Sequence, residues 1–330
     1  MNRKEFIGKG LVAGAFLGPS AVVGAQSTKK ESTNNPREDV FIERPVSGRP
    51  HEGKVLAAIQ PHCDDLAFFA AGTVAKLIDE GYTGYMIRTT NDDAAGRGKT
   101  IGERVYNNEK GTYSVAEALG LKKVYDLGYR NHRMDEYNIQ EIKGRLIFLF
   151  RLLKVDTIIC YDPYGAYEEN PDHYITARAV EAASWMAGMG TDYPEQLEVV
   201  EPHGVSEKYY FARGPQLVNR VVDISRYVDK KVGSNTANIY QGPGVSGAAL
   251  RRDLAKSGKE LPILGNSDES ANRAYIKHFM LDMDSEAIRG VPSDKLIGEK
   301  YGLGWAERFH YIGPKKSFQA TYMEEHAKMK

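Results

Sequence analysis

The sequence predicts an α/β fold with a doubly wound, mostly parallel sheet and a mixed, partly helical C-terminal extension. Two observations support this prediction. From Lys54 onward, short apolar or β-branched runs alternate with longer segments of helical periodicity, which is typical of parallel strands joined by crossover helices. The chain has 330 residues, enough to bury a large core in one big domain or two unequal ones.

The alternating elements begin with a strand and repeat four times. The short runs predict strands at 54–60, 85–90, 123–129 and 155–161, and the longer patterns predict helices at 66–81, 106–120, 138–154 and 171–188. Two helix starts carry local signals: Asn138 followed by Glu141 resembles a capping box, and Pro171 suits a first helical turn.

Beyond Gly190 the pattern loosens. Residues 208–214 and 217–225 predict a pair of strands, and helical or irregular segments follow to the end of the chain. We therefore expect an α/β domain over residues 54–241 and an extension, residues 242–330, packed on the same domain.

The first 25 residues have the pattern of an export signal. A positively charged head containing Arg3 and Lys4 precedes a glycine-interrupted apolar stretch, 11–23, that is too short for a membrane span. The head also loosely resembles a twin-arginine signal, so we expect a periplasmic or extracellular protein. The alternative is a disordered or helical N-terminal arm. Residues 26–53 are polar and rich in proline, which predicts an extended linker.

The charge balance limits the classes of ligand. Lys plus Arg equals Asp plus Glu at 44 each, so no basic field attracts nucleic acid or an anionic membrane. The Gly-rich loop of dinucleotide and P-loop proteins is absent after the first predicted strand, where residues 62–65 read His-Cys-Asp-Asp. A small-molecule or glycan substrate fits this pattern best.

The two cysteines, Cys63 and Cys160, end two apolar runs and could be neighbours in space. An exported chain permits a disulfide between them. A core of this size needs no such cross-link, so we expect free thiols.

Ionisable residues gather where two predicted strands end. His62, Asp64 and Asp65 follow the first strand, and the loop 162–173 follows the fourth, which neighbours the first in a doubly wound order. Such a concentration of charge needs water, mutual pairing or a metal. His62 and Asp65, three residues apart at a strand-to-helix turn, can face one point, and His173 can complete a three-ligand zinc site. Asp64 then stays free as a base. The alternatives are a surface or capping role for His62 and a backbone-bonded role for His173.

These residues resemble the motifs of the PIG-L/LmbE-like family, zinc-dependent relatives of the N-acetylglucosaminyl-phosphatidylinositol de-N-acetylases that remove acyl groups from amino sugars. The family motif His-Pro-Asp-Asp-Glu corresponds to His-Cys-Asp-Asp-Leu at 62–66, and His-Pro-Asp-His corresponds to Asn-Pro-Asp-His at 170–173. The resemblance spans about residues 54–241. It implies a Rossmann-like sheet, zinc on His62, Asp65 and His173, Asp64 as general base, and an oxyanion donor in Tyr167, whose alternative is a loop aromatic stacked on the sheet edge.

The chain departs from the family at several titratable positions. Asn170 stands where the family has a histidine, Asn131 where it has an aspartate, and Asn238 where it has a histidine. An amide can donate a hydrogen bond to an oxyanion but cannot give a proton to a leaving amine. His132 is a candidate for that role, with a solvent-facing loop histidine as the alternative.

Further polar residues follow the second predicted strand. We expect Asp92, Asp93 and Arg104 to bind substrate together with Asn131 and His132. The alternative for the first three is a solvated loop with a salt bridge on the helix face.

The sequence thus predicts an exported zinc-dependent hydrolase that removes an N-acyl group, most simply acetyl, from an amino sugar of a glycan or glycoconjugate. A non-catalytic carbohydrate-binding relative that keeps the metal is one alternative, and a hydrolase of another amide or ester is a second. Asp64, which no structural metal site requires, favours the enzyme.

Overall fold

The computed structural model describes residues 40–283, 291–314 and 318–328. In these ranges an eight-stranded sheet has the order β1-β7-β8-β6-β5-β2-β3-β4. The strands are β1 (Phe41–Glu43), β2 (Val55–Gln60), β3 (Thr83–Thr90), β4 (Val124–Tyr129), β5 (Thr157–Tyr161), β6 (Glu207–Phe211), β7 (Arg220–Asp223) and β8 (Ala306–Ile312). All neighbouring strands pair in parallel except β8, which is antiparallel to both β6 and β7.

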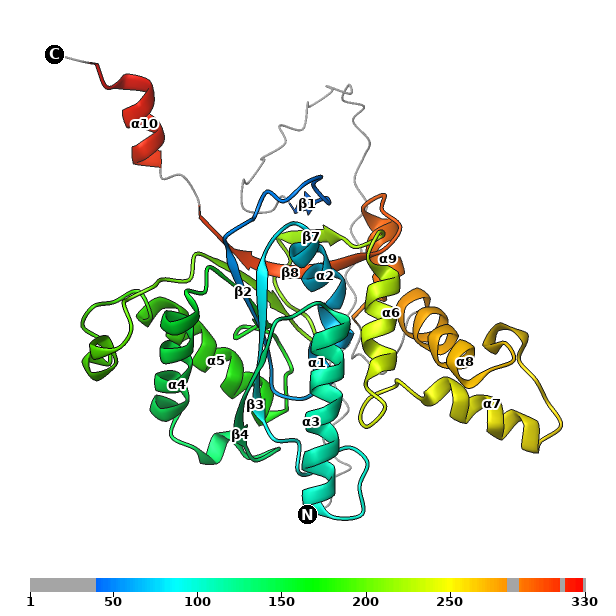
Figure 1. Ribbon diagram of the computed structural model, residues 1–330. Coiled ribbons are helices and arrows are strands. Elements are labelled where there is room, and N and C mark those ends of the chain that lie inside the picture. Colours follow the sequence, from blue (N-terminus) through cyan, green and yellow to red (C-terminus); the bar gives the residue numbers. More distant parts are fainter. Residues whose placement is uncertain (1–39, 284–290, 315–317, 329–330) are drawn as a thin grey trace, which may run out of the picture. The chain divides into compact units, whose positions relative to one another are not determined.

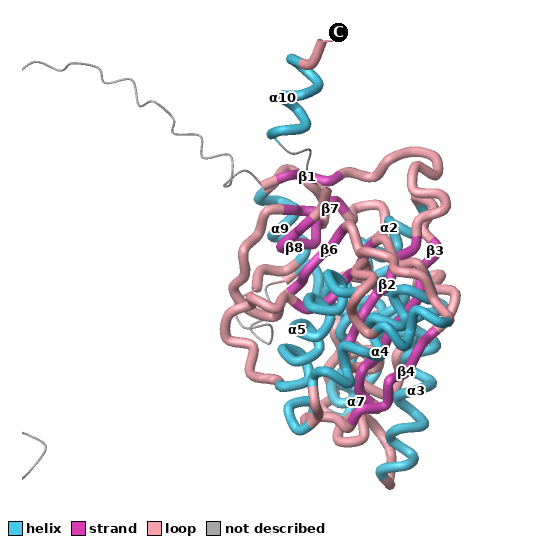
Figure 2. The backbone as a smooth tube through the Cα atoms, turned by 90° about the vertical axis from the view of Figure 1, so that its left-hand side faces the viewer, coloured by secondary structure: helices cyan, strands magenta, loops and turns pink. Residues whose placement is uncertain are grey.

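Helices cover both faces of the sheet, as Figures 1 and 2 show. The helices are α1 (Asp65–Phe69), α2 (Ala71–Asp79), α3 (Ile101–Ala118), α4 (Ile139–Leu153), α5 (Pro171–Met186), α6 (Val228–Ala237), α7 (Ser246–Lys256), α8 (Asp268–Ala274), α9 (Asp294–Lys300) and α10 (Phe318–His326). Short 3₁₀ turns are η1 (Met134–Glu136), η2 (Pro194–Glu198) and η3 (Pro262–Leu264), and η4 (Tyr275–Asp282) is a π-helix. Helices α4 and α5 pack on one face, whereas α1, α2, α3 and α6 pack on the other.

The centre of the sheet is the centre of the core. Ala57 of β2 pairs with Tyr85 of β3 on one side and with Ile158 of β5 on the other. Residues 56–60 and 157–161 are buried throughout, as expected for parallel strands with helices on both faces. The predicted doubly wound, mostly parallel α/β fold is confirmed.

The strands predicted at 208–214 and 217–225 form as β6 and β7, but the prediction that they pair is wrong. Strand β8 lies between them and pairs with each. Its residues come from the predicted C-terminal extension, about 80 positions further along the chain, and local periodicity carries no information about such a distant partner. The predicted linker also contributes a strand, because β1 pairs with β7 at the sheet edge.

Two helix boundaries and one helix cap differ from the sequence prediction. The single helix expected at 66–81 is divided at Ala70 into α1 and α2. Helix α3 begins at Ile101 rather than near 106, because the Thr100 side chain caps it by accepting a hydrogen bond from the backbone of Glu103. The capping box at Asn138 is replaced by a simple cap, in which Asn138 accepts a hydrogen bond from Gln140 N. The first-turn role of Pro171 is confirmed.

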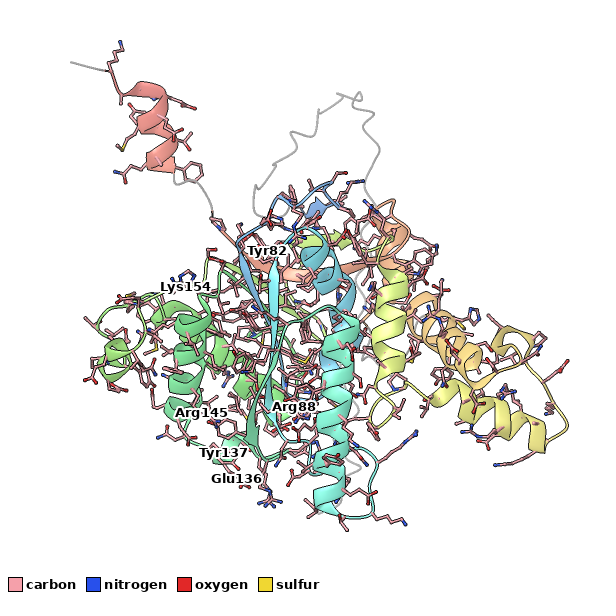
Figure 3. The ribbon with its side chains drawn as sticks, in the orientation of Figure 1. Tyr82, Arg88, Glu136, Tyr137, Arg145 and Lys154 are labelled. Carbon is pink, nitrogen blue, oxygen red and sulfur yellow. The ribbon has the colours of Figure 1, made fainter. Side chains whose placement is uncertain are left out.

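Polar side chains also brace the sheet from within. Arg88, labelled in Figure 3, lies on β3. It donates from Nε to Asp126 on β4 at 2.6 Å, and its Nη1 lies 3.4 Å from Asp92. Cys63 and Cys160 are both buried free thiols.

The predicted export signal at residues 1–25 lies outside the described residues. Within the described ranges, none of the helices has the length and apolar character needed to cross a bilayer.

Candidate active site

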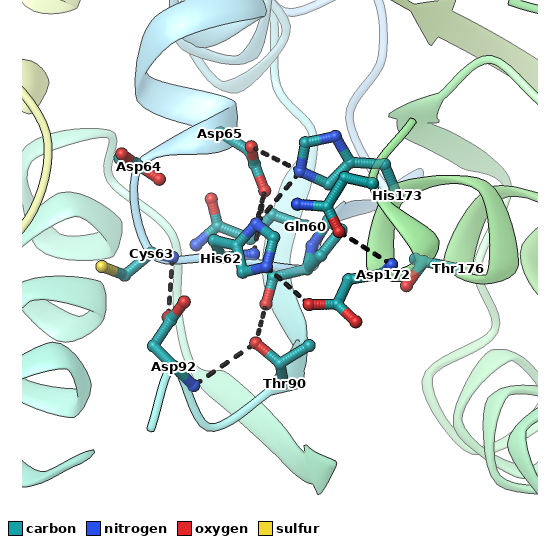
Figure 4. A network of polar contacts seen from close by, with 12 residues as sticks. Gln60, His62, Cys63, Asp64, Asp65, Thr90, Asp92, Asp172, His173 and Thr176 are labelled. Carbon is teal, nitrogen blue, oxygen red and sulfur yellow. Dashed lines mark hydrogen bonds and ion pairs between the residues drawn. The ribbon is translucent and has the colours of Figure 1, made fainter. Parts of the chain in front are cut away.

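The polar cluster lies at the carboxyl ends of β2 and β5, which are neighbours in the sheet (Figure 4). His62 occupies the turn after β2, Asp65 begins α1, and His173 lies in the first turn of α5. All three side chains are buried. The sheet order therefore brings together two sequence segments that are more than 100 residues apart.

The three side chains present their ligand atoms to a common point. His62 Nδ1 lies 3.0 Å from His173 Nε2 and 3.4 Å from an Asp65 oxygen, and His173 Nε2 lies 3.6 Å from the other Asp65 oxygen. A tetrahedral zinc ion with bonds of about 2.1 Å separates its ligands by about 3.4 Å. Two imidazole nitrogens 3.0 Å apart also require either a shared proton or a cation. The donor set and its spacing thus fit zinc.

A second group of possible ligands consists of His62, His132 and Asp172. It is a weaker candidate because His132 is exposed and because Asp172 already has three hydrogen-bond partners. The Asp172 carboxylate accepts from the backbone nitrogens of His132, at 2.6 Å, and Met134, at 3.1 Å, and it contacts His62 Nε2 at 2.9 Å.

Neighbouring side chains orient the three candidate ligands. Asp172 holds His62 Nε2, which favours the tautomer that leaves Nδ1 free to bind a metal. The Tyr161 hydroxyl donates to Asp65 Oδ1 at 2.7 Å, and the Tyr161 ring stacks on His173 with centroids 4.1 Å apart. Arrangements of this kind are typical of the shell around a metal site.

The pKa shifts of His62 and Asp65 indicate that the cluster stabilises a positive charge. Burial opposes the protonated form of His62, yet the hydrogen bonds that its ring donates to the Asp172 and Asp65 carboxylates outweigh it and raise the His62 pKa well above its ordinary value. Burial also opposes the charged form of Asp65, but the positive charge of His173 and the hydrogen bond with His62 outweigh it and lower the Asp65 pKa. The surroundings therefore stabilise positive charge where a cation would bind.

Asp64 lies next to this cluster but outside it (Figure 4). Its Oδ1 accepts a hydrogen bond from Gln241 Nε2 at 3.3 Å. Burial, reinforced by the neighbouring Asp65 carboxylate, raises the Asp64 pKa to about 6. A carboxylate with a pKa near neutrality, beside a cluster that can bind metal, has the properties of a general base.

A cavity of about 340 Å³ joins Asp64 to the three candidate ligands. This volume is at the lower end of the range for small-ligand pockets. The remaining walls are formed by apolar and polar side chains from several segments: Phe68, Phe69, Ala95, Asn131, His132, Asn170, Arg213, Gln241 and Met280. Met280 belongs to η4, so the predicted C-terminal extension contributes to the cavity.

Asn170 both caps α5 and lines the cavity. Its Oδ1 accepts a hydrogen bond from Asp172 N at 3.0 Å, which is the helix cap that asparagine favours. The cap occupies Oδ1, so any contact with a ligand in the cavity falls to the amide nitrogen, which can only donate.

Asn131 and His132 reach the cavity from the loop after β4. Asn131 is buried, and its Oδ1 has no hydrogen-bond partner among the residues that the structure describes. His132 is exposed, has a φ of 60°, and stands edge-on to His62 with ring centroids 6.1 Å apart. Both therefore lie where they can contact a substrate.

Four other predicted site residues do not line the cavity. Tyr167 is 81% exposed. Asp92 and Asp93 are buried braces: Asp92 accepts a hydrogen bond from Cys63 N at 3.0 Å, and Asp93 accepts from Asn131 N at 2.9 Å. Arg104 lies in the first turn of α3. The two aspartates thus act on the site indirectly, by holding the loops that carry His62 and Asn131.

Several residues of the site were absent from the sequence prediction. Tyr161 ends β5 at the same sheet edge as the ligands, a position that could have marked it. Arg213 follows β6 at that edge and binds Glu168 through two hydrogen bonds, at 3.0 and 2.6 Å. Glu168 in turn lies 3.1 Å from His173 Nδ1. Met280 carries no local signal, because only the tertiary fold brings η4 to the cavity.

Comparison with known proteins adds independent support. Residues 57–184 match the family described as PIG-L, GlcNAc-PI de-N-acetylase. The diacetylchitobiose deacetylase of Thermococcus kodakarensis is 26% identical over 186 residues, covering 54% of this chain and 67% of that protein. The probable N-acetyl-alpha-D-glucosaminyl L-malate deacetylase 2 of Bacillus cereus is 26% identical over 180 residues, covering 51% of this chain and 76% of that protein.

A solved structure has the same fold. The N,N'-diacetylchitobiose deacetylase from Pyrococcus horikoshii, in complex with an inhibitor, superposes with a TM-score of 0.58 at 20% identity and covers 78% of this chain and 84% of that one. The family match over residues 57–184 and the two sequence relatives agree with the resemblance of the motifs at 62–66 and 170–173 to the PIG-L/LmbE-like family, and the solved structure shows the same fold.

Proposed function

We propose that this protein is an exported, zinc-dependent hydrolase that removes the acetyl group from an N-acetylated amino sugar of a glycan or glycoconjugate. The observation that carries the proposal is the presence, in one cavity, of three convergent candidate ligands and a separate carboxylate, Asp64. A structural metal site has no need of that carboxylate, whereas amide hydrolysis needs a proton acceptor.

His62, Asp65 and His173 would hold the metal. When bound, zinc supplies Lewis acidity that polarises an amide carbonyl and makes water a stronger acid. Asp64 accepts the proton that the attacking water loses, and Gln241 fixes the orientation of the Asp64 carboxylate through its hydrogen bond. Asp172 keeps a proton on His62 Nε2.

Asn170 and His132 act on the carbonyl oxygen and on the departing amine of the substrate amide. The Asn170 amide nitrogen donates to the carbonyl oxygen as negative charge develops there. Asn170 cannot protonate the departing amine, so we assign that step to His132, the imidazole that lines the cavity without belonging to the proposed metal site.

The sugar is inferred from relatives and from the composition of the cavity. The named relatives deacetylate diacetylchitobiose or a glucosaminyl malate. The cavity combines amide and imidazole groups with the rings of Phe68 and Phe69, a mixture that suits the hydroxyls and apolar faces of a sugar. The balanced charge of the chain and the signal-like residues 1–25 agree with an extracytoplasmic glycan substrate.

Acetate release is the direct test. Protein lacking residues 1–25 should deacetylate at least one member of a panel of N-acetylated mono- and oligosaccharides, lose this activity with a chelator, and regain it with zinc. Parallel assays on acetyl esters and N-acetyl amino acids test other acyl substrates. Sugar binding without acetate release from the zinc-loaded protein would contradict the proposal and favour a carbohydrate-binding role.

A further inference from the structure

The Glu168 carboxylate lies among hydrogen-bond donors. Glu168 belongs to the loop between β5 and α5, and its side chain is only 11% exposed. Its Oε1 accepts from Asn170 N at 3.0 Å and from Arg213 Nη2 at 2.6 Å. Its Oε2 accepts from Arg213 Nε at 3.0 Å and lies 3.1 Å from His173 Nδ1. Three of these four neighbouring groups can only donate, so Glu168 is built into the loop as an acceptor.

This arrangement determines which nitrogen of His173 carries a proton. Glu168 is paired with the charged Arg213 guanidinium through two hydrogen bonds, and an ionised carboxylate only accepts hydrogen bonds. His173 Nδ1 is buried, and among the described residues its one polar contact is the Glu168 oxygen. An unprotonated Nδ1 would place its lone pair against that oxygen. Nδ1 is therefore the protonated nitrogen, and in the neutral imidazole Nε2 carries the free lone pair.

The Nε2 atom of His173 is the one that faces the candidate metal site. It lies 3.0 Å from His62 Nδ1 and 3.6 Å from Asp65 Oδ1 (Figure 4), whereas Nδ1 faces Glu168. A histidine that binds a metal typically donates its other ring N–H to a carboxylate or a carbonyl, which fixes the tautomer and the ring orientation and makes the ligand more basic. Glu168 has this relation to His173.

Arg213 holds Glu168 in place from a different strand. It follows β6, which pairs with β5 in the sheet, and its guanidinium contacts both oxygens of the carboxylate. A bidentate pair of this kind fixes the orientation of the carboxylate as well as its position. Arg213 also lines the catalytic cavity, so the pair lies at the edge of the site. The sheet, and not the loop alone, thus sets the position of Glu168.

We propose that Glu168 is a positioning residue for the metal site, which holds His173 with Nδ1 protonated and Nε2 directed at the metal, and that Arg213 anchors Glu168 in this task. This inference rests on the metal site of the proposed function. It is specific to the trio of His62, Asp65 and His173, because the second possible trio does not contain His173.

The zinc affinity of the purified protein tests this role. Glu168→Gln keeps the size of the side chain but places an amide NH₂ group among donors, so the Kd for zinc, measured by competition with a chelating dye, should rise roughly 10- to 100-fold. Arg213→Met keeps the carboxylate but removes its anchor, and it should raise the Kd by a smaller factor. Glu117→Gln, an exposed substitution on α3, is the control and should leave the Kd unchanged.

A spectroscopic measurement separates positioning of His173 from a merely structural role of Glu168. In nitrogen-edited NMR spectra of the zinc-loaded protein, Glu168→Gln should move the His173 Nδ1–H proton upfield, because the hydrogen bond to a carboxylate is lost. The His62 Nε2–H proton, which faces Asp172, should keep its position.

Two results would overturn the inference while leaving the deacetylase proposal intact. One is an unshifted His173 signal. The other is an unchanged zinc Kd in folded Glu168→Gln protein, or in Arg213→Met if Glu168→Gln does not fold. Either result would leave Glu168 as a brace of the loop before α5. A wild type that binds no zinc would instead contradict both this inference and the metal-dependent function.

Discussion

The identity of the third ligand decides between the two possible metal sites. His173 belongs only to the trio with Asp65, whereas His132 belongs only to the trio with Asp172. Removing one of three ligands from a zinc site destroys its geometry. His173→Ala should therefore lose the bound zinc, and His132→Ala should retain about one ion per chain, as measured by elemental analysis of purified protein.

A matched control is His203→Ala, which removes a histidine that lies outside the site, 3.3 Å from Asp156, and should leave the zinc content unchanged. Loss of zinc in the His132 variant together with its retention in the His173 variant would transfer the site to the second trio.

Asn170 has an observed role as a helix cap and a proposed role as an oxyanion donor, and substitution can separate the two. Asn170→Ser keeps a side chain that can cap α5 but removes the amide donor in the cavity. We expect Asn170→Ala to lower both the melting temperature and kcat, the latter by roughly 10- to 10³-fold, as for one lost oxyanion donor. Asn170→Ser should restore the melting temperature without restoring kcat. Full activity in the serine variant would reduce Asn170 to a helix cap.

The sequence predicted the roles of those residues that directly follow the ends of strands. His62, Asp65 and His173 converge because parallel strands deliver their following turns to one edge of the sheet. The side-chain directions of loop residues were beyond prediction, because they depend on tertiary contacts. Asp92 turns inward to hold the backbone at Cys63.

At the level of secondary structure, one strand of the C-terminal extension holds the start of a distant helix. Glu307 of β8 is buried and accepts hydrogen bonds from the backbone nitrogens of Gly72, at 3.0 Å, and Thr73, at 2.7 Å, in the first turn of α2. It also lies 2.7 Å from the buried ammonium of Lys231 on α6. The residue before α2 is Ala70, whose methyl side chain cannot accept a hydrogen bond. Glu307 therefore provides the acceptor for the first backbone nitrogens of α2.

Loss of the Glu307 carboxylate should be strongly destabilising. Glu307→Ala leaves two helix nitrogens without their acceptor and leaves the buried Lys231 with only the half-buried Asp294 as an ion-pair partner among the described residues. Breaking a buried pair in this way costs about 3–5 kcal/mol in the free energy of unfolding. Urea unfolding measures the change. Glu299→Ala, which removes an exposed ion pair with Lys295 on α9, serves as the control and should cost at most about 1 kcal/mol.

Helices and strands whose boundaries or partners depend on such long-range contacts could not be predicted from the sequence. The four strand–helix repeats were predictable because each is a local pattern. The division between α1 and α2 and the insertion of β8 between β6 and β7 depend on partners more than 80 residues away, which no local pattern reveals.

For the molecule as a whole, the sheet order explains why one cavity combines the candidate metal ligands with the proposed base and the proposed substrate-binding residues. Strands β2 and β5 bring the ligands together, the loop after β4 adds His132, and η4 adds Met280. The family resemblance predicted the first of these contributions, because the motifs at 62–66 and 170–173 lie in the segments that follow β2 and β5. The contribution of η4 lies beyond the family match, which ends at residue 184.

The measurement that tests the central claim most directly combines kcat and zinc content for Asp64→Asn. The substitution keeps the shape of the side chain and a partner for Gln241 but removes the proton acceptor. We predict a zinc content equal to that of the wild type, an unchanged melting temperature, and a kcat for acetate release lower by roughly 10²- to 10⁴-fold. Asp253→Asn, an exposed substitution on α7, should behave like the wild type. Undiminished acetate release by zinc-loaded Asp64→Asn would contradict the assignment of Asp64 as the base of a metal-dependent deacetylase.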